Sequence, residues 1–126
     1  MNLLTPSEAL FRLKELIETG TYGYNYTFVP TEKNRLLSEL YYFDDKKKKE
    51  ILLQLSEKDF DREGYGDSEE HKDDYLYVFI KRGIKLLPRY STELKTEQVD
   101  IYIKFYFAGD VNNIVFVLSF HKADDY

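Results

Sequence analysis

The sequence predicts an α+β fold, in which N-terminal helices pack on one face of an antiparallel sheet. Apolar residues recur at helical spacing early in the chain, beginning with a capped segment at 5–20. Two later segments, 98–107 and 113–121, alternate apolar residues with other residues at every second position, as strands with one buried face do. Because the helices come before the strands, a layered α+β arrangement is favoured.

The predicted helices have clear boundary signals. Thr5 is placed to cap the first helix and Glu8 completes a capping box. Gly20 is expected to end this helix in the left-handed conformation. Thr31 and Asp44 can cap two shorter helices that follow. The residues expected to face inward from the second helix are Leu36, Leu37 and Leu40.

The two alternating segments are predicted to form a hairpin, since the residues between them, 108–112, include Gly109 and have turn chemistry. Pairing Phe107 with Ile114 gathers the apolar residues of both segments on one face. A slip by one residue would bury Lys104, so the pattern opposes it. On the open face, this register pairs Asp100 with His121, Tyr102 with Ser119, and Lys104 with Val117.

An acidic stretch separates the helices from the strands. Residues 57–74 hold nine acidic against three basic side chains, and 61–74 lacks apolar periodicity. We therefore expect a mobile, solvent-facing loop at about 61–74. Residues 75–80 are apolar on both faces, which indicates a covered strand. No repeat or second set of elements follows, so 1–126 is expected to be a single domain.

Composition narrows the classes of function. The chain has 126 residues, no cysteine and two histidines, which excludes disulfides and thiolate metal sites and leads us to expect no metal or other cofactor. It has neither a signal-peptide pattern nor an apolar run near the roughly 20 residues of a membrane span, so a cytoplasmic protein without a membrane partner is expected. Although the net charge is −5, residues 81–95 are locally basic.

Four short motifs follow one another along the chain. They are Leu-Ser-Glu-Lys-Asp-Phe at 55–60, Leu-Tyr-Val-Phe at 76–79, Val-Asp-Ile-Tyr-Ile-Lys at 99–104 and Leu-Ser-Phe-His-Lys at 118–122. In this order they resemble the MqsR-like toxins of type II toxin–antitoxin systems, over about residues 7–122. The resemblance implies a RelE-like fold and a metal-independent endoribonuclease that cleaves messenger RNA, free or on the ribosome. It also implies a cognate antitoxin protein that neutralises the enzyme.

The resemblance transfers unevenly to individual positions. Leu76 stands where a glutamine is expected, and the net charge of −5 differs from that of the typically basic members. The site residues that the resemblance implies are Tyr102, Lys104 beside it, Arg62 after the first motif, and His121 with Lys122 next to it.

The residue types suit RNA cleavage, which needs a base for the 2′-hydroxyl, a cation for the charged phosphorane and an acid for the leaving oxygen. His121 suits proton transfer, and Asp100 directly opposite would orient its ring. Tyr102 can donate a proton or stack on a base. The predicted catalytic residues are His121, Tyr102, Lys104, Arg62 and Asp100. The predicted substrate-binding residues, through phosphate contacts, are Lys81, Arg82, Lys85, Arg89 and Lys122.

Other interpretations of the same residues stay open. The polar strand face can be an ordinary solvated surface with a routine Asp–His pair. The chain can be a non-catalytic acidic binding protein, for example a phage-encoded one, whose 57–74 segment inhibits a basic partner such as a nuclease. It can also be a member of the toxin family that has lost activity.

Overall fold

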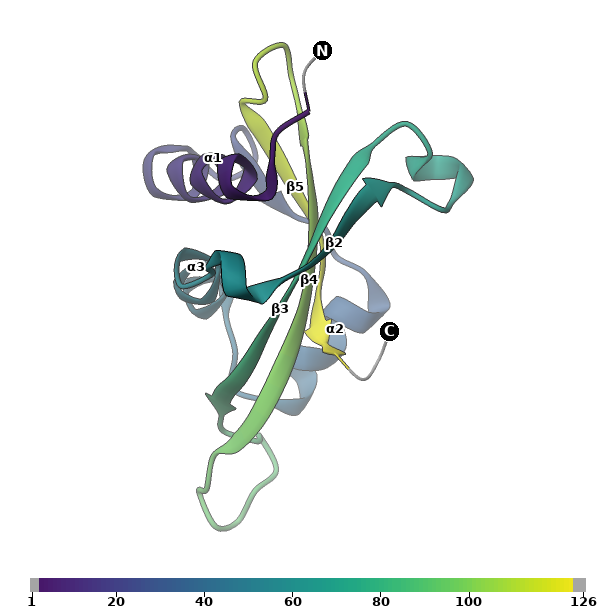
Figure 1. Ribbon diagram of the computed structural model, residues 1–126. Helices are drawn as coiled ribbons and strands as arrows, with labels where there is room; N and C mark the ends of the chain where they lie inside the picture. The colour runs from purple at the N-terminus through teal and green to yellow at the C-terminus, as the bar shows by residue number, and fades with distance from the viewer. Residues whose placement is uncertain (1–2, 124–126) are drawn as a thin grey trace.

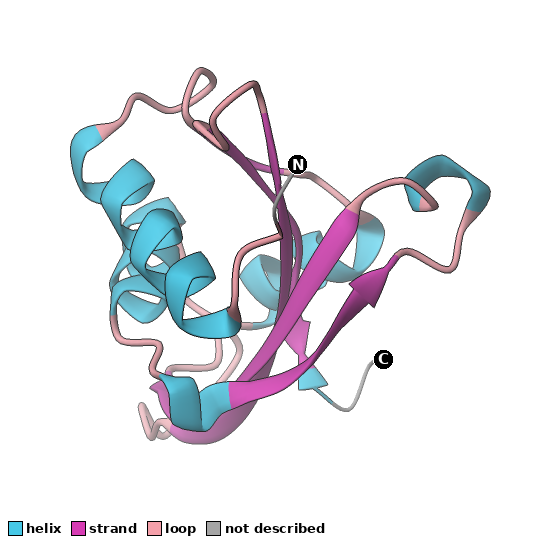
Figure 2. Cartoon of the chain, turned by 45° about the horizontal axis from the view of Figure 1, so that its top comes forward, coloured by secondary structure: helices cyan, strands magenta, loops and turns pink. Residues whose placement is uncertain are grey.

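The computed structural model describes residues 3–123, which form three α-helices and a five-stranded sheet (Figures 1 and 2). In the sheet order β1-β5-β4-β3-β2, β1 runs parallel to β5 and the other neighbours are antiparallel. The predicted α+β class is confirmed, with the parallel β1 as a departure from an all-antiparallel sheet. In chain order the elements are α1 (Pro6–Thr19), β1 (Tyr26–Phe28), α2 (Glu32–Leu40), α3 (Asp45–Leu53), η1 (Glu57–Asp59), β2 (Phe60–Tyr65), η2 (Glu69–His71), β3 (Tyr75–Leu86), β4 (Glu97–Ala108) and β5 (Ile114–Lys122).

The helices begin where the capping residues predict. Thr5 and Glu8 form the capping box of α1, and the side chains of Thr31 and Asp44 accept backbone N–H groups at the starts of α2 and α3. Gly20 ends α1, but in an extended conformation (φ −91°), so the predicted left-handed cap is wrong. Glycine is required because a Cβ there would meet backbone and side-chain atoms at under 3 Å. No helix within residues 3–123 is long and apolar enough to cross a membrane.

The prediction that the helices share one face of the sheet is wrong for α2. Helices α1 and α3 cover one face (Figure 1), whereas α2 lies along the outer edge of β5. Because β1 spans only three residues, it leaves that edge unpaired beyond Val117. There the side chain of the buried Asn34, from α2, takes the place of a strand partner. It donates to the carbonyl of Leu118 and accepts from the N–H of Phe120, both at 2.8 Å. Of the three leucines expected to face inward from α2, Leu37 alone is buried.

The β4–β5 hairpin forms, but the predicted register is wrong. Near the turn, Ile114 lies opposite Ala108 instead of Phe107. The pairs as far as Val117 are shifted by the same one residue. Leu118 is then an extra residue in β5, a β-bulge that shifts the pairing again. The predicted Asp100–His121 and Tyr102–Ser119 pairs therefore do not form. The observed pairs include Phe107–Val115, Phe105–Val117, Lys104–Ser119 and Tyr102–His121.

The bulge has a packing reason. β5 is apolar at both odd and even positions, so its alternation does not define a single register. Val115 and Val117 face the core before Leu118, and Phe120 faces it after, each at most 1% exposed. One extra residue between Val117 and Phe120 brings both onto the same face, which a regular strand could not do.

The segment expected to be a loop at 61–74 begins as a strand. Residues 60–65 form β2, which pairs antiparallel with the start of β3, and only 66–74 make the connection that carries η2. This β2–β3 arm projects from the body of the molecule (Figures 1 and 2). β2 is an edge strand with mostly charged, exposed side chains, which is how edges avoid pairing with other chains, and its sequence therefore lacks the apolar signal of a strand.

Candidate functional site

A groove lies on the face of the sheet opposite α1 and α3. The alternation of β4 turns Ile101 and Ile103 into the core and Tyr102 and Lys104 to the other side. There the groove consists of two hollows, of about 500 and about 510 Å³, and Arg62, Tyr102 and Lys104 line both of them. We call them the hairpin hollow, beside the β2–β3 arm, and the α2 hollow. The hairpin hollow is also lined by Glu63, Gly64, Tyr65, Gly66, Asp67, Ser68, His71, Leu76 and Val78, and the α2 hollow by Thr31, Glu32, Lys33, Ser119 and His121.

Sheet pairing explains how residues far apart in the sequence meet in the groove. Arg62 of β2 lies opposite Val78 of β3, which lies opposite Lys104 of β4, which in turn lies opposite Ser119 of β5. Residues paired across strands face the same side, so this row runs straight across the open face. Two residues further along each strand on the same face, Tyr102 lies opposite His121. The register that the bulge produces therefore puts the histidine beside the tyrosine.

His121 is held by ring stacking and by its own backbone neighbour. Its ring lies 5.1 Å from that of Tyr102 at an interplanar angle of 19°, and both residues are 4% exposed. The Nδ1 atom lies 2.9 Å from the carbonyl oxygen of Lys122. Because a carbonyl only accepts, Nδ1 carries the proton, which leaves Nε2 as the acceptor of the neutral ring. The backbone carbonyl of Lys122 thus orients the ring, which is the role that the sequence predicts for Asp100.

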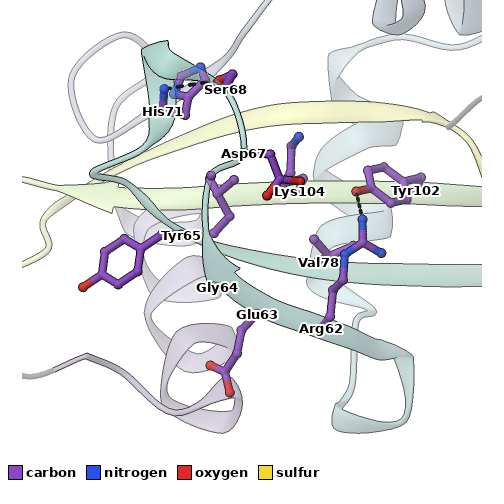
Figure 3. A pocket seen from close by; sticks show the side chains of 12 residues that line it. Arg62, Glu63, Gly64, Tyr65, Asp67, Ser68, His71, Val78, Tyr102 and Lys104 are labelled. Carbon is purple, nitrogen blue, oxygen red and sulfur yellow. Dashed lines mark hydrogen bonds between the residues drawn. The ribbon is translucent and has the colours of Figure 1, made fainter.

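Arg62 reaches over the sheet from the projecting arm. Its Nη2 donates to the hydroxyl of Tyr102 at 2.9 Å, and its guanidinium lies 5.7 Å from the centre of that ring (Figure 3). Its Nη1 donates to Asp61 at 2.6 Å. The Arg62 side chain remains 55% exposed, so its charge faces solvent in the groove. Tyr102 therefore connects the cation of the arm to the imidazole of β5.

Three cations gather around this tyrosine. Burial is the main cause that lowers the pKa of Lys104, and the charges of Arg62 and Lys33 lower it further, while Asp67 opposes them. Lys33 comes from the start of α2. The α2 hollow is lined by three basic residues, Lys33, Arg62 and Lys104, and by one acidic residue, Glu32. This hollow is therefore suited to an anionic group, although the chain as a whole is acidic.

Asp100 lies apart from the groove. Its carboxylate accepts the backbone N–H of Gly83 at 3.0 Å, where β3 and β4 change register. With Arg82 and Lys122 it lines a separate hollow at the far end of these strands. The predicted catalytic pairing of Asp100 with His121 is therefore wrong, and Asp100 has a local structural contact instead.

The five residues predicted to bind RNA phosphates are also dispersed, and Lys122 lies in the hollow of Asp100. Lys81 lies near η1, with its amino group 3.4 Å from the carboxylate of Asp59. Arg89 packs its guanidinium over the ring of Tyr42, at 4.9 Å from the ring centre. Lys85 is exposed on the distal part of β3, and Arg82 lines the hollow of Asp100. They do not form one strip with the groove.

Sequence reasoning missed Lys33 and Asp67 as groove residues. Lys33 enters the groove only because α2 packs against the β5 edge, which no local pattern indicates. Asp67 is one of several acidic residues close together in the sequence, and nothing in the sequence sets it apart from the others. Leu76, where the family resemblance calls for glutamine, is buried in the hairpin hollow and offers no polar group. In the described part of the chain, no group of three or more His, Cys, Asp or Glu side chains is arranged to hold a metal ion.

Comparison of the chain with known protein families, with curated proteins and with solved structures found no match.

Proposed function

We propose that this protein is an endoribonuclease toxin that cleaves messenger RNA without a metal ion and is neutralised by a cognate antitoxin. The observation that carries the proposal is the contact of Tyr102 with both Arg62 and His121, in a groove that also holds Lys33 and Lys104. A proton-transfer group, a phenol and several cations are what cleavage of a phosphodiester by the neighbouring 2′-hydroxyl requires.

Nε2 of His121 takes the proton of the 2′-hydroxyl, whose oxygen attacks phosphorus as the bond from phosphorus to the 5′-oxygen breaks. Arg62 and Lys33 offset the charge that develops on the phosphorane oxygens. Lys104 protonates the leaving 5′-oxygen, and its lowered pKa makes it a stronger acid than an ordinary lysine. The products are a 2′,3′-cyclic phosphate and a 5′-hydroxyl.

Expression in bacteria tests the proposal. The wild-type chain should arrest growth, and His121→Ala should abolish the arrest. Because His121 is buried, alanine can also unfold the protein, so His121→Asn is the decisive variant: its amide nitrogen can replace Nδ1 as donor to Lys122, but it cannot serve as the base. Lys95→Ala, at a side chain that is 80% exposed outside the groove, is the control that should still arrest growth. Arrest by a folded His121→Asn variant would refute the catalytic role.

A second candidate function rests on the projecting β2–β3 arm. Its tip carries exposed carboxylates on a segment that stands out from the body, as a surface that binds a basic protein would. A non-catalytic inhibitor of this kind should be unaffected by His121→Asn. It should lose binding to its partner when the tip is neutralised at Asp67, Glu69, Glu70, Asp73 and Asp74.

A further inference from the structure

The hairpin hollow differs from the α2 hollow in chemistry. Its floor contains Leu76 and Val78, which are 8% and 3% exposed. Gly64 and Gly66 form part of its wall, and a Cβ added at Gly64 would meet nothing within 4 Å. The missing side chain of Gly64 leaves this part of the wall open to a ligand, whereas Gly66 lies directly against His71. At about 500 Å³, the hollow lies in the range that binds small organic groups, roughly 300–1,000 Å³.

One carboxylate is directed into this hollow. Figure 3 shows Asp67 pointing toward Lys104, whereas Glu63 and Tyr65 extend away from them. Glu63 lies opposite Tyr77 and beside Tyr75 on the core face, where burial and then the charge of Glu63 raise the pKa of Tyr75. Asp67 lies beyond the end of β2, in the connection at 66–74, where strand alternation no longer fixes the direction of a side chain. Asp67 is exposed, so its oxygens can accept hydrogen bonds from a ligand.

The two hollows are contiguous. Arg62, Tyr102 and Lys104 line both, so a phosphate bound by these cations would have the hairpin hollow directly beside it. A nucleotide so placed has its base next to Leu76, Val78 and the carboxylate of Asp67, in a hollow whose other lining residues are mostly polar. A second phosphate would be repelled there by Asp67, whereas an uncharged, flat base would not.

We propose, on the basis of the proposed ribonuclease function, that the hairpin hollow binds one nucleobase of the RNA and that Asp67 selects against uracil. A carboxylate only accepts hydrogen bonds. Adenine, cytosine and guanine each carry an exocyclic amino group that donates to it, while uracil offers only its ring N3–H, which lies between two carbonyl oxygens that repel a carboxylate. Cytosine and uracil have the same ring and differ at this amino group, so they are the sharpest comparison.

Binding of short cytidine and uridine oligoribonucleotides to the inactive His121→Asn variant, followed by fluorescence anisotropy in EDTA at low salt, tests the inference. Uracil lacks the amino group that donates to the charged Asp67. The loss of this hydrogen bond should make oligo(U) bind about tenfold more weakly than oligo(C). Adding Asp67→Asn should bring the two affinities within about twofold, because a carboxamide can donate as well as accept. Adding Asp73→Asn, which removes a charge from the same tip outside the hollow, should keep the difference.

Two results would overturn the inference while leaving the ribonuclease proposal intact. One is equal binding of the two oligonucleotides to the protein that retains Asp67. The other is an Asp67→Asn variant that binds both more tightly by the same factor, which would make Asp67 a simple electrostatic barrier to RNA. If neither oligonucleotide binds, while circular dichroism shows a folded protein, the ribonuclease proposal fails as well.

Discussion

Replacing Asn34 by alanine tests how the α2 wall of the groove is held. The Asn34 side chain makes three hydrogen bonds of 2.8 Å, with the carbonyls of Val29 and Leu118 and the N–H of Phe120. The last two are buried. Alanine would leave two buried backbone groups without partners, at about 1–3 kcal/mol each. At about 1.5 kcal/mol each, the expected loss is about 3 kcal/mol, a large part of the roughly 5–15 kcal/mol that stabilises a typical domain.

Urea denaturation followed by circular dichroism measures this loss. With a slope of about 2 kcal/mol per molar urea, the unfolding midpoint should fall by about 1.5 M and the slope should not change. Asn113→Ala, at an exposed asparagine, is the matched control and should change stability by less than about 0.5 kcal/mol. A loss below about 1 kcal/mol for Asn34→Ala would show that α2 does not depend on these bonds, and the account of the groove wall would be wrong.

Two further predictions concern the groove itself. Tyr102→Phe keeps the stack on His121 but removes the hydroxyl that accepts from Arg62. RNA cleavage should fall at least about tenfold, while urea denaturation should show a stability change within about 1 kcal/mol. Unchanged cleavage would contradict the role of this hydrogen bond. For Lys104, the lowered pKa means that the unfolded chain holds the proton more tightly than the folded chain, so ionised Lys104 opposes folding below its folded pKa. Wild-type stability relative to Lys104→Met should therefore rise with pH as the pH approaches 10.5, the ordinary lysine value, and a flat or falling difference would contradict the assigned burial.

Helix starts and the existence of the final hairpin could be predicted because their signals are local. Thr31 and Asp44 cap the N–H groups of the turn that follows them, so neighbouring residues suffice to identify them. The left-handed cap at Gly20 was predicted from residue type alone. The actual need for glycine there is the close approach of Asn25, which depends on how the chain returns.

Register and site could be predicted only in part, because they depend on packing between distant segments. Regular alternation in the sequence predicts one uninterrupted register for β5. The core requires Val117 and Phe120 on one face, and the extra residue Leu118 makes this possible. His121 and Tyr102 were expected on the same open face and are found there, although through a different pairing. Lys33 joins them only through the docking of α2, which a sequence pattern does not contain.

The most direct test of the central claim is cleavage of a single-stranded RNA by the purified protein in excess EDTA, with analysis of the product ends. The account predicts 2′,3′-cyclic phosphate and 5′-hydroxyl ends, formed by the wild-type protein and not by His121→Asn. An intact RNA, or the same products from both proteins, would contradict the claim that Arg62, Tyr102, Lys104 and His121 form a ribonuclease site.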